Sequence, residues 1–377
     1  MPSSDLSQFR RQLAAWLDEH RHELVLADRP DGLDGDVAQM RHAIGRLHDA
    51  GWMRYGWPEA VGGLGGADLL RVAFAEEVAA RDLFSTPVYT LTEILGPPVT
   101  ELAPEIAAEF VPRLLRGEET WCQGFSEPDA GSDLAALRTR ATEDGDCFRV
   151  TGQKIWSSFA QYASRMVLLA RTGTAESRHR GITAFFVDLD TPGITVRPFE
   201  AIHGKPDFNE VFFDDARIPA ERVIGTVNGG WPVTMRILQA ERGAIFWMES
   251  AWMLARLGEF VAGGHLGGDA DEALGHAYAS IAAIRSRSWT TQHRVADGTI
   301  ASPETSIDKI LTARAEQELF DLLQTRGGGL VEFGDDPQAD HWRSEYLYSR
   351  AASIYGGTSE IQKNILADHV LGMKGAS

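Results

Sequence analysis

Hydrophobic residues in the first 120 positions recur at helical spacing. In DVAQMRHAIGRLHDAGWM (36–53), apolar side chains fall three and four positions apart, and Gly51 suits the left-handed residue that ends a helix. The stretches ADLLRVAFAEEVAARDL (67–83) and PEIAAEFVPRLLRG (104–117) repeat the pattern. We therefore predict an N-terminal α-helical domain over residues 1–120.

The pattern changes to short strands after this region. Five runs rich in β-branched and aromatic residues are bounded by Gly, Asp and Pro, which is typical of antiparallel β-structure. We predict a small antiparallel β-barrel over residues 121–229, with a two-sheet sandwich as the alternative. The runs are CFRVTGQKIWSS (147–158), RMVLLART (165–172), GITAFFVDLD (181–190), GITVRPFE (193–200) and NEVFFDDARIP (209–219).

Helical periodicity returns at residue 230 in longer stretches. They cover residues 231–261, 272–298, 306–327 and the tail from Ser359. Four long amphipathic stretches predict a C-terminal four-helix bundle over residues 230–377. The fold class expected for the whole chain is therefore α+β, with the β domain between two helical domains.

Composition excludes several classes of function. The 377 residues carry a formal net charge of −18, which disfavours binding to nucleic acid or to an anionic membrane. No apolar run is long enough for a membrane-spanning helix. Cys122 and Cys147 are the only cysteines, so we expect a reducing cytoplasm and no disulfide framework. The two cysteines and the eleven histidines do not show the spacing of metal ligands, so we expect no metal.

Four motifs in order carry the most specific chemical information. They are WCQGFSEPDAGSDLAALRT (121–139), GQKIWSS (152–158), FNEVFFDDARIP (208–219) and IYGGTSEIQKNILA (354–367). With this order and layout, nearly the whole chain closely resembles the acyl-CoA dehydrogenase family. The resemblance implies FAD held between the β-domain and the bundle, and oxidation of an acyl-CoA to the trans-2-enoyl-CoA. It also implies a homotetramer, or a heterotetramer with a paralogue, that passes electrons to an electron-transfer flavoprotein.

The resemblance also assigns cofactor contacts in the β-domain. The Ser126 hydroxyl is expected near the flavin ring, Ser158 is expected to donate to flavin N5, and Trp156 to cover the flavin face. Such donors stabilise the negative charge that the ring gains on reduction. For Trp156, packing in the core is the alternative. The complete set expected here is Gln123, Phe125, Ser126, Ser132, Trp156 and Ser158.

A second group of contacts is implied for the FAD of the adjacent subunit. Glycines allow the backbone to approach a dinucleotide, and a helix N-terminus favours pyrophosphate. One segment departs from the family pattern: FVAGGHLGGDADEALG (260–275) has no arginine where many members place one against the FAD pyrophosphate. This departure leaves room for a partner subunit that supplies the contact. The positions carried over are Gln324, Gly327, Gly328, Thr358 and Glu360.

The catalytic base cannot stand at its commonest family position, because this chain has Gly356 there. The resemblance implies that the backbone N–H of Gly356 still helps to polarise the thioester carbonyl. Other members place the base on the first bundle helix, where this chain has Glu241. Glu241 interrupts an otherwise apolar stripe, and a desolvated carboxylate has a raised pKa that suits a general base. The alternative is a structural ion pair with an arginine from another helix.

Three functions follow from these observations. The leading hypothesis is an acyl-CoA dehydrogenase, and the moved base favours branched or bulky acyl groups, including sterol-like ones. The second is a half-site or non-catalytic subunit that assembles with a paralogue. The third is a flavin oxidase or monooxygenase on the same fold.

Overall fold

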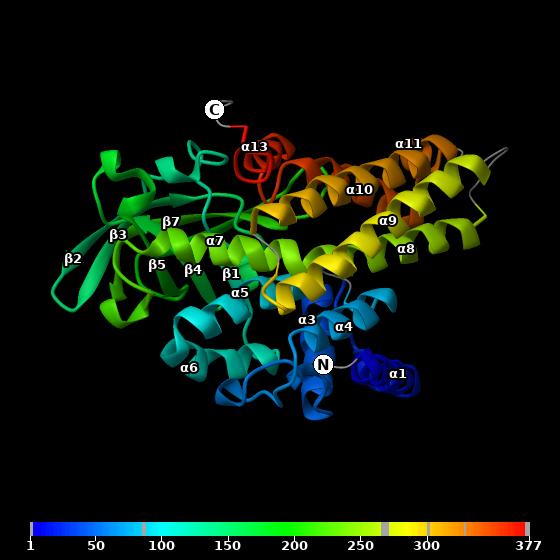
Figure 1. Ribbon diagram of the computed structural model, residues 1–377, viewed down its shortest axis with the longest axis horizontal. Coiled ribbons are helices and arrows are strands. Elements are labelled where there is room, and N and C mark those ends of the chain that lie inside the picture. Colours follow the sequence, from blue (N-terminus) through cyan, green and yellow to red (C-terminus); the bar gives the residue numbers. More distant parts are fainter. Residues whose placement is uncertain (1–2, 85–87, 265–270, 300–301, 328, 374–377) are drawn as a thin grey trace.

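The three regions are distinct in the computed structural model, which describes residues 3–84, 88–264, 271–299, 302–327 and 329–373. Figure 1 shows the N-terminal helices in blue and cyan, the strands in green, and the C-terminal helices in yellow to red. The predicted order of a helical region, a strand-rich region and a second helical region is confirmed.

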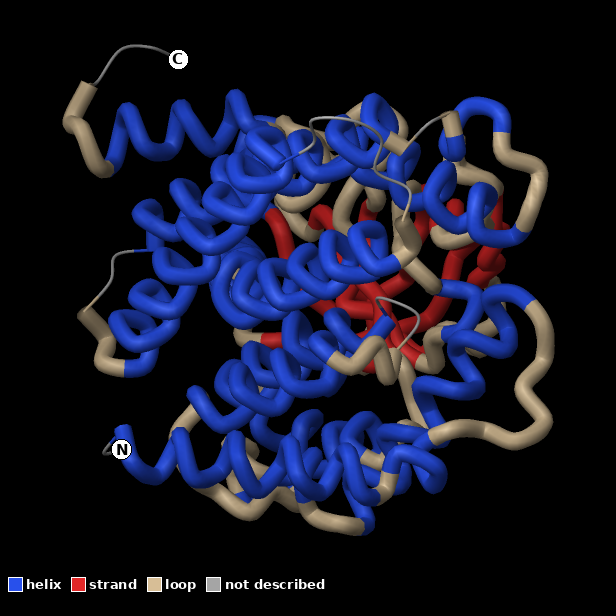
Figure 2. Tube along the Cα trace, turned by 90° about the vertical axis from the view of Figure 1, so that its right-hand side faces the viewer, coloured by secondary structure: helices blue, strands red, loops and turns tan. Residues whose placement is uncertain are grey.

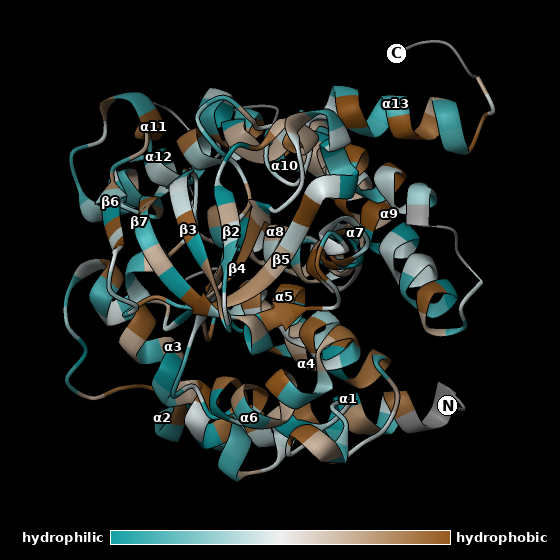
Figure 3. Ribbon diagram, turned by 90° about the vertical axis from the view of Figure 1, so that its left-hand side faces the viewer, coloured by the Kyte–Doolittle hydropathy of each residue, from teal (hydrophilic) through white to brown (hydrophobic). Residues whose placement is uncertain are grey.

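The N-terminal region consists of helices packed around leucine-rich faces. Leu13, Leu17, Leu47 and Leu95 are fully buried because the helical periodicity places them on inward faces. In Figure 3, α5 is largely hydrophobic and lies between the other N-terminal helices and the sheet. The helices are α1 (Ser3–Glu19), α2 (Arg21–Leu24), α3 (Gly32–Asp49), α4 (Leu69–Ala80), α5 (Val88–Leu102) and α6 (Pro104–Leu115).

The middle region is the predicted strand-rich domain, and its sheet is mixed, because two of its strand pairs are parallel and not antiparallel as predicted. The strands follow the order β6-β7-β3-β2-β4-β5-β8, and β1 pairs with β4 outside this path. Figure 2 shows the strands gathered in one part of the molecule, with helices packed around them. The strands are β1 (Trp121–Gly124), β2 (Arg140–Asp144), β3 (Cys147–Lys154), β4 (Arg165–Arg171), β5 (Ile182–Asp188), β6 (Ile194–Phe199), β7 (Phe208–Pro219) and β8 (Val223–Ile224).

Strand direction explains the difference from the prediction. Both β1 and β2 run parallel to β4, whereas the other pairs are antiparallel. A parallel pair needs a long connection, and here the connection from β1 to β4 contains the β2–β3 hairpin. Val167 and Leu169 pack toward the helices while Met166 and Leu168 pack into a second core, so β4 is covered on both faces.

The C-terminal region is a bundle in which α8, α9 and α10 run beside one another (Figure 1). Its core includes Met253, Ile281 and Leu319, together with Trp342, whose ring meets Phe260 edge to face at 5.5 Å. The predicted long helices are present, but α12 was not predicted. The elements are α7 (Gly230–Ala240), the π-helical turn η7 (Glu241–Ile245), α8 (Phe246–Ala262), α9 (Asp271–Ala296), α10 (Ser306–Arg326), α11 (Leu330–Phe333), α12 (Pro337–Ser349), the 3-10 turn η9 (Arg350–Ser353) and α13 (Ser359–His369).

A buried carboxylate joins the two helical regions. Glu76 on α4 accepts hydrogen bonds from Trp247 on α8 at 2.8 Å, and pairs with Arg10 at 2.5 Å and with Arg285 on α9. Because a buried charge is costly without partners, these contacts fix how α4 lies against the bundle.

Two features are absent from the residues that the structure describes. Within those ranges, none of the helices is both long and apolar enough to cross a bilayer. The same ranges hold no cluster of three or more His, Cys, Asp or Glu side chains suited to a metal ion.

Candidate active site

Glu241 begins a π-helical turn in the first bundle helix. Residues Glu241–Ile245 form this turn between α7 and α8. A π-turn adds one residue to the helical repeat, and such turns are frequent at functional sites. Val233, Ile237 and Ile245 of the predicted apolar stripe are buried, and Glu241 is partly buried. The sequence prediction of a carboxylate on an apolar face is therefore confirmed.

Gly356 meets the Glu241 carboxylate directly. A Cβ added at Gly356 would lie 2.5 Å from Glu241 Oε1, and Gly356 has a φ of +64°, which favours glycine. Any larger residue at this position would displace the carboxylate. The carboxylate of Glu241 therefore lies where a side chain at position 356 would begin, so the two positions considered for the base meet at one point in space.

Burial raises the pKa of Glu241, and the positive charges of Lys309 and then Arg242 oppose the rise. Within the described ranges, no salt bridge joins Glu241 to a cation. The alternative of a structural ion pair with an arginine from another helix is thus not found there. Arg242 is also buried and its Nε has no partner among the described residues, while its Nη2 lies 4.0 Å from the Cβ position of Gly357.

The motif residues of the β-domain come together at the ends of β1 and β3. Ile155 N–H donates to Ser126 O at 3.0 Å, so the segment after Gln123 lies against the segment containing Trp156 and Ser158. Gln123 Nε2 is buried and has no hydrogen-bond partner among the described residues. Phe125 is buried.

Trp156 is not a core residue. Its side chain is 55% exposed and its φ is +62°, a region that non-glycine residues rarely adopt. Phe199 and Phe208 contact its ring edge to face at 5.2 and 5.5 Å. Two aromatic supports and an open ring suit a stacking surface better than packing in a core, which was the alternative.

Glu127 holds in place the loop that begins with Ser126, Glu127 and Pro128. Glu127 accepts from the N–H groups of Arg138 and Thr139 at 2.6 and 2.8 Å, and from Lys154 Nζ at 2.7 Å. These contacts give Glu127 a structural role in the loop. Ser132 is exposed at the surface of the same loop.

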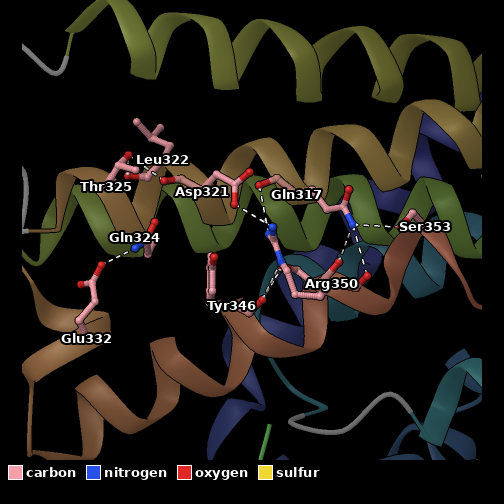
Figure 4. Close-up of polar contacts among 10 residues, drawn as sticks. Gln317, Asp321, Leu322, Gln324, Thr325, Glu332, Tyr346, Arg350 and Ser353 are labelled. Carbon is pink, nitrogen blue, oxygen red and sulfur yellow. Dashed lines mark hydrogen bonds and ion pairs between the residues drawn. The ribbon is translucent and has the colours of Figure 1, made fainter. Parts of the chain in front are cut away.

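The second predicted group divides between two places. Thr358 caps α13 by accepting from Ile361 N–H at 3.2 Å, close to Gly356, and Glu360 is exposed in the first turn. Gln324 lies near the other end of α10, where its amide donates to Glu332 (Figure 4). Gly327 ends α10, and Gly328 lies outside the described residues.

A polar network holds the segment that leads to Gly356. Arg350 donates to Asp321 at 2.8 Å, and Gln317 donates to Ser353 Oγ at 3.3 Å, which ties η9 to α10 (Figure 4). The sequence pattern did not predict this network. Its members come from two helices that are far apart in the chain, and helical periodicity does not show such contacts.

Comparison with known proteins covers almost the whole chain. Models of the N-terminal, middle and C-terminal domains of acyl-CoA dehydrogenase match residues 3–118, 122–216 and 228–371. The acyl-CoA dehydrogenase IpdE1 of Mycobacterium tuberculosis is 37% identical, and the match covers 98% of each chain.

Two solved structures are similar over their full length. The Tcur3481-Tcur3483 steroid ACAD has a TM-score of 0.84 with 25% identity, over 100% of this chain and 99% of that one. The ChsE4-ChsE5 complex from Mycobacterium tuberculosis has a TM-score of 0.80 with 25% identity, over 100% and 99%.

Proposed function

The chain belongs to the acyl-CoA dehydrogenase family, whose members are oxidoreductases acting on a CH–CH bond, and we propose that Glu241 is its catalytic base. The reaction proposed is FAD-dependent oxidation of an acyl-CoA thioester to the trans-2-enoyl-CoA. The observation that carries this proposal is the position of the Glu241 carboxylate, which lies where the side chain of a larger residue at position 356 would begin.

The surroundings of Glu241 suit proton abstraction. An ionised carboxylate takes the α-proton of the thioester, and its raised pKa increases its strength as a base. Lys309 and Arg242 keep the ionised form accessible, because both positive charges lower the pKa that burial raises. Gly356 lies beside this carboxylate, and its N–H would polarise the thioester carbonyl, which acidifies the α-proton.

The β-domain residues fit FAD. Gln123 offers a buried amide without a partner among the described residues, and Trp156 offers an exposed ring. Ser126 and Ser158 would supply hydroxyl donors to the ring, and Thr358 with Glu360 would contact the nucleotide part. When bound, FAD would accept the hydride from Cβ of the acyl group.

Two observations favour assembly with a paralogue. The segment 260–275 has no arginine for the FAD pyrophosphate, and its residues 265–270 lie outside the described ranges. The similar solved structures are named as the pairs Tcur3481-Tcur3483 and ChsE4-ChsE5. We therefore propose a heterotetramer in which this chain supplies Glu241 and the partner completes FAD binding. The electron acceptor proposed is an electron-transfer flavoprotein.

The proposed substrate carries a bulky, sterol-like acyl group. The carboxylate reaches the site from position 241 of the first bundle helix and not from position 356, and this change in the direction of the base reshapes the pocket in favour of a bulky acyl group. The name steroid ACAD of a similar structure supports the same class. A preference for short linear acyl-CoA thioesters over sterol-like ones in a turnover assay would contradict this part of the proposal.

Glu241→Gln tests the base assignment. We expect turnover to fall by at least about three orders of magnitude while flavin content stays unchanged, because the amide cannot accept the α-proton. Glu259→Gln is the matched control, because Glu259 is exposed on α8 and pairs with Arg256 of its own helix. Turnover of Glu241→Gln at the level of this control would reject the assignment.

A further inference from the structure

Lys309 is a buried cation beside the proposed base. Its side chain is 3% exposed, and its Nζ donates to the backbone oxygen of Ala352 at 2.5 Å. Within the described ranges, no salt bridge joins Lys309 to a carboxylate. A buried ammonium group with one neutral acceptor is costly, so its retention requires compensating interactions.

Part of the compensation comes from aromatic rings. Lys309 Nζ lies 4.0 Å from the ring centroid of Tyr355 and 5.9 Å from that of Phe246, in cation–π geometry. Ala352 and Tyr355 both belong to the segment that leads directly to Gly356. Lys309 therefore fixes this segment against α10. The contacts of Arg350 and Gln317 tie the preceding turn η9 to the same helix (Figure 4).

Lys309 and Glu241 converge on the same point. The Cε of Lys309 lies 3.5 Å from the Cβ position of Gly356, and Glu241 Oε1 lies 2.5 Å from it. The ammonium group is thus close enough to act on the carboxylate through space without forming a direct ion pair. A direct ion pair would occupy the oxygen that has to accept the α-proton.

Two further carboxyl groups share this region. In an unbroken α-helix, Glu249 would be rotated about 80° from Glu241, but the extra residue of the π-turn reduces this to about 20°. The two carboxyl groups therefore lie on one face of the helix. Glu316 on α10 is buried, and its carboxylate accepts from the Tyr355 hydroxyl at 3.4 Å.

These carboxyl groups compete for the positive charge. Burial raises the pKa of Glu249 to about 7 and the pKa of Glu316 to about 8. Glu249 Oε2 is buried and has no partner among the described residues. Lys309 opposes the pKa rise in both, while its own pKa is lowered by burial.

The remaining charged or titratable groups around the cluster are few. Arg242 contributes a second positive charge from η7, and α12 contributes Glu345, whose pKa is raised by burial, and Tyr348. Lys309 and Arg242 are therefore the cations near Glu241, Glu249 and Glu316. Glu345 adds a fourth carboxyl group beside Glu316, and the positive charges of His341, Lys205 and Arg256 oppose its own pKa rise.

We propose that Lys309 is a positioning residue, which holds the Gly356 segment against the Glu241 carboxylate and favours the charged state of that carboxylate. The inference rests on the proposed function of Glu241 as the base. It adds that one lysine from α10 serves both halves of the site, the base and the backbone N–H of Gly356.

Lys309→Gln is the sharpest variant, because it retains a donor for Ala352 O and removes the charge. Without the charge, the pKa of Glu241 rises, so the base becomes ionised only at higher pH. The acid limb of the kcat/KM profile of the holoenzyme is therefore expected to move up by about one pH unit.

Infrared titration of the Glu241 carboxyl band gives a readout independent of turnover. The band is identified by its loss in Glu241→Gln, and its midpoint is expected to move up in Lys309→Gln. Lys363→Met, which changes an exposed lysine on α13, is the control and is expected to leave both profiles unchanged. If Lys309→Gln does not fold, Lys309→Met, which removes the charge and keeps a similar side-chain volume, takes its place, and an unmoved limb contradicts the proposal.

The outcomes distinguish the proposed role of Lys309 from the proposed role of Glu241 as the base. An inactive Glu241→Gln with unmoved profiles in a folded Lys309→Gln would reject the role of Lys309 and leave the base assignment standing. A fully active Glu241→Gln would reject the base assignment and the role of Lys309 with it.

Discussion

The two ends of α10 differ in the contacts that surround them: Lys309, near the start, lies in a buried cluster, and Gln324, near the end, lies at the surface. Near its start, Lys309 is buried between Glu241 and the Gly356 segment, and every group in the cluster comes from this chain. Near its end, Gln324 is partly exposed and contacts Glu332 of α11. Fifteen residues of helix separate Lys309 from Gln324, which is about 22 Å. The first end holds buried groups that contact one another within this chain, whereas the function proposed for the second end depends on FAD from another subunit.

This difference separates two kinds of inference. A buried cluster constrains its own chemistry, because each buried charge needs a compensating contact that is visible within the chain. An exposed amide at a helix end satisfies its hydrogen bonds locally, so the single chain says little about a partner. The base assignment therefore depends on packing, and the assignment of Gln324 depends on family resemblance.

Gly356→Ala would disturb the arrangement of Glu241 and Lys309 around Gly356. The added methyl group meets Glu241 Oε1 and the backbone keeps a strained positive φ, so we expect kcat to fall by about 100-fold through displacement of the carboxylate. Gly145→Ala is a matched control, because Gly145 has a φ of +66° with open space around its Cβ position. The backbone strain is similar in both, and a similar loss of kcat in both variants would show that the contact with Glu241 has no role.

Purification of the chain with and without a paralogue would test whether FAD binding needs a partner subunit. Because the segment 260–275 has no arginine, the chain alone is expected to retain well below one FAD per subunit, and the complex several times more per site. The measurement is the ratio of flavin to protein absorbance after gel filtration. Full flavin occupancy of the isolated chain would contradict the need for a partner.

Gln324→Ala would test whether the exposed end contacts FAD. Loss of one hydrogen bond is expected to weaken FAD binding to the complex by about 3- to 10-fold and to leave the pH profile unchanged. Thr325→Ala is the control, because the Thr325 hydroxyl donates to Asp321 O within the helix (Figure 4). Equal FAD dissociation constants for Gln324→Ala and the control would remove Gln324 from the site.

The sequence predicted Glu241 because one acidic residue interrupts an apolar helical face, and a periodic pattern reveals such an interruption. It did not predict Lys309 or Glu316, because Lys309 approaches Glu241 from another helix, Glu316 contacts Tyr355 from that same helix, and periodicity within α10 does not reveal either contact. The π-turn was also missed, although it decides that Glu249 shares the face of Glu241. In the middle region, the strands were predicted from their composition, but the parallel pairing of β1 and β2 with β4 depends on contacts distant in sequence.

The most direct test of the central claim measures proton removal apart from oxidation. The holoenzyme is incubated anaerobically in D2O with an acyl-CoA thioester that cannot lose its β-hydrogen, and uptake of deuterium at Cα is followed. Rapid uptake in the wild type and loss of uptake in Glu241→Gln, with substrate binding retained, is the result that the proposed role of Glu241 predicts. Equal uptake in both proteins would contradict it.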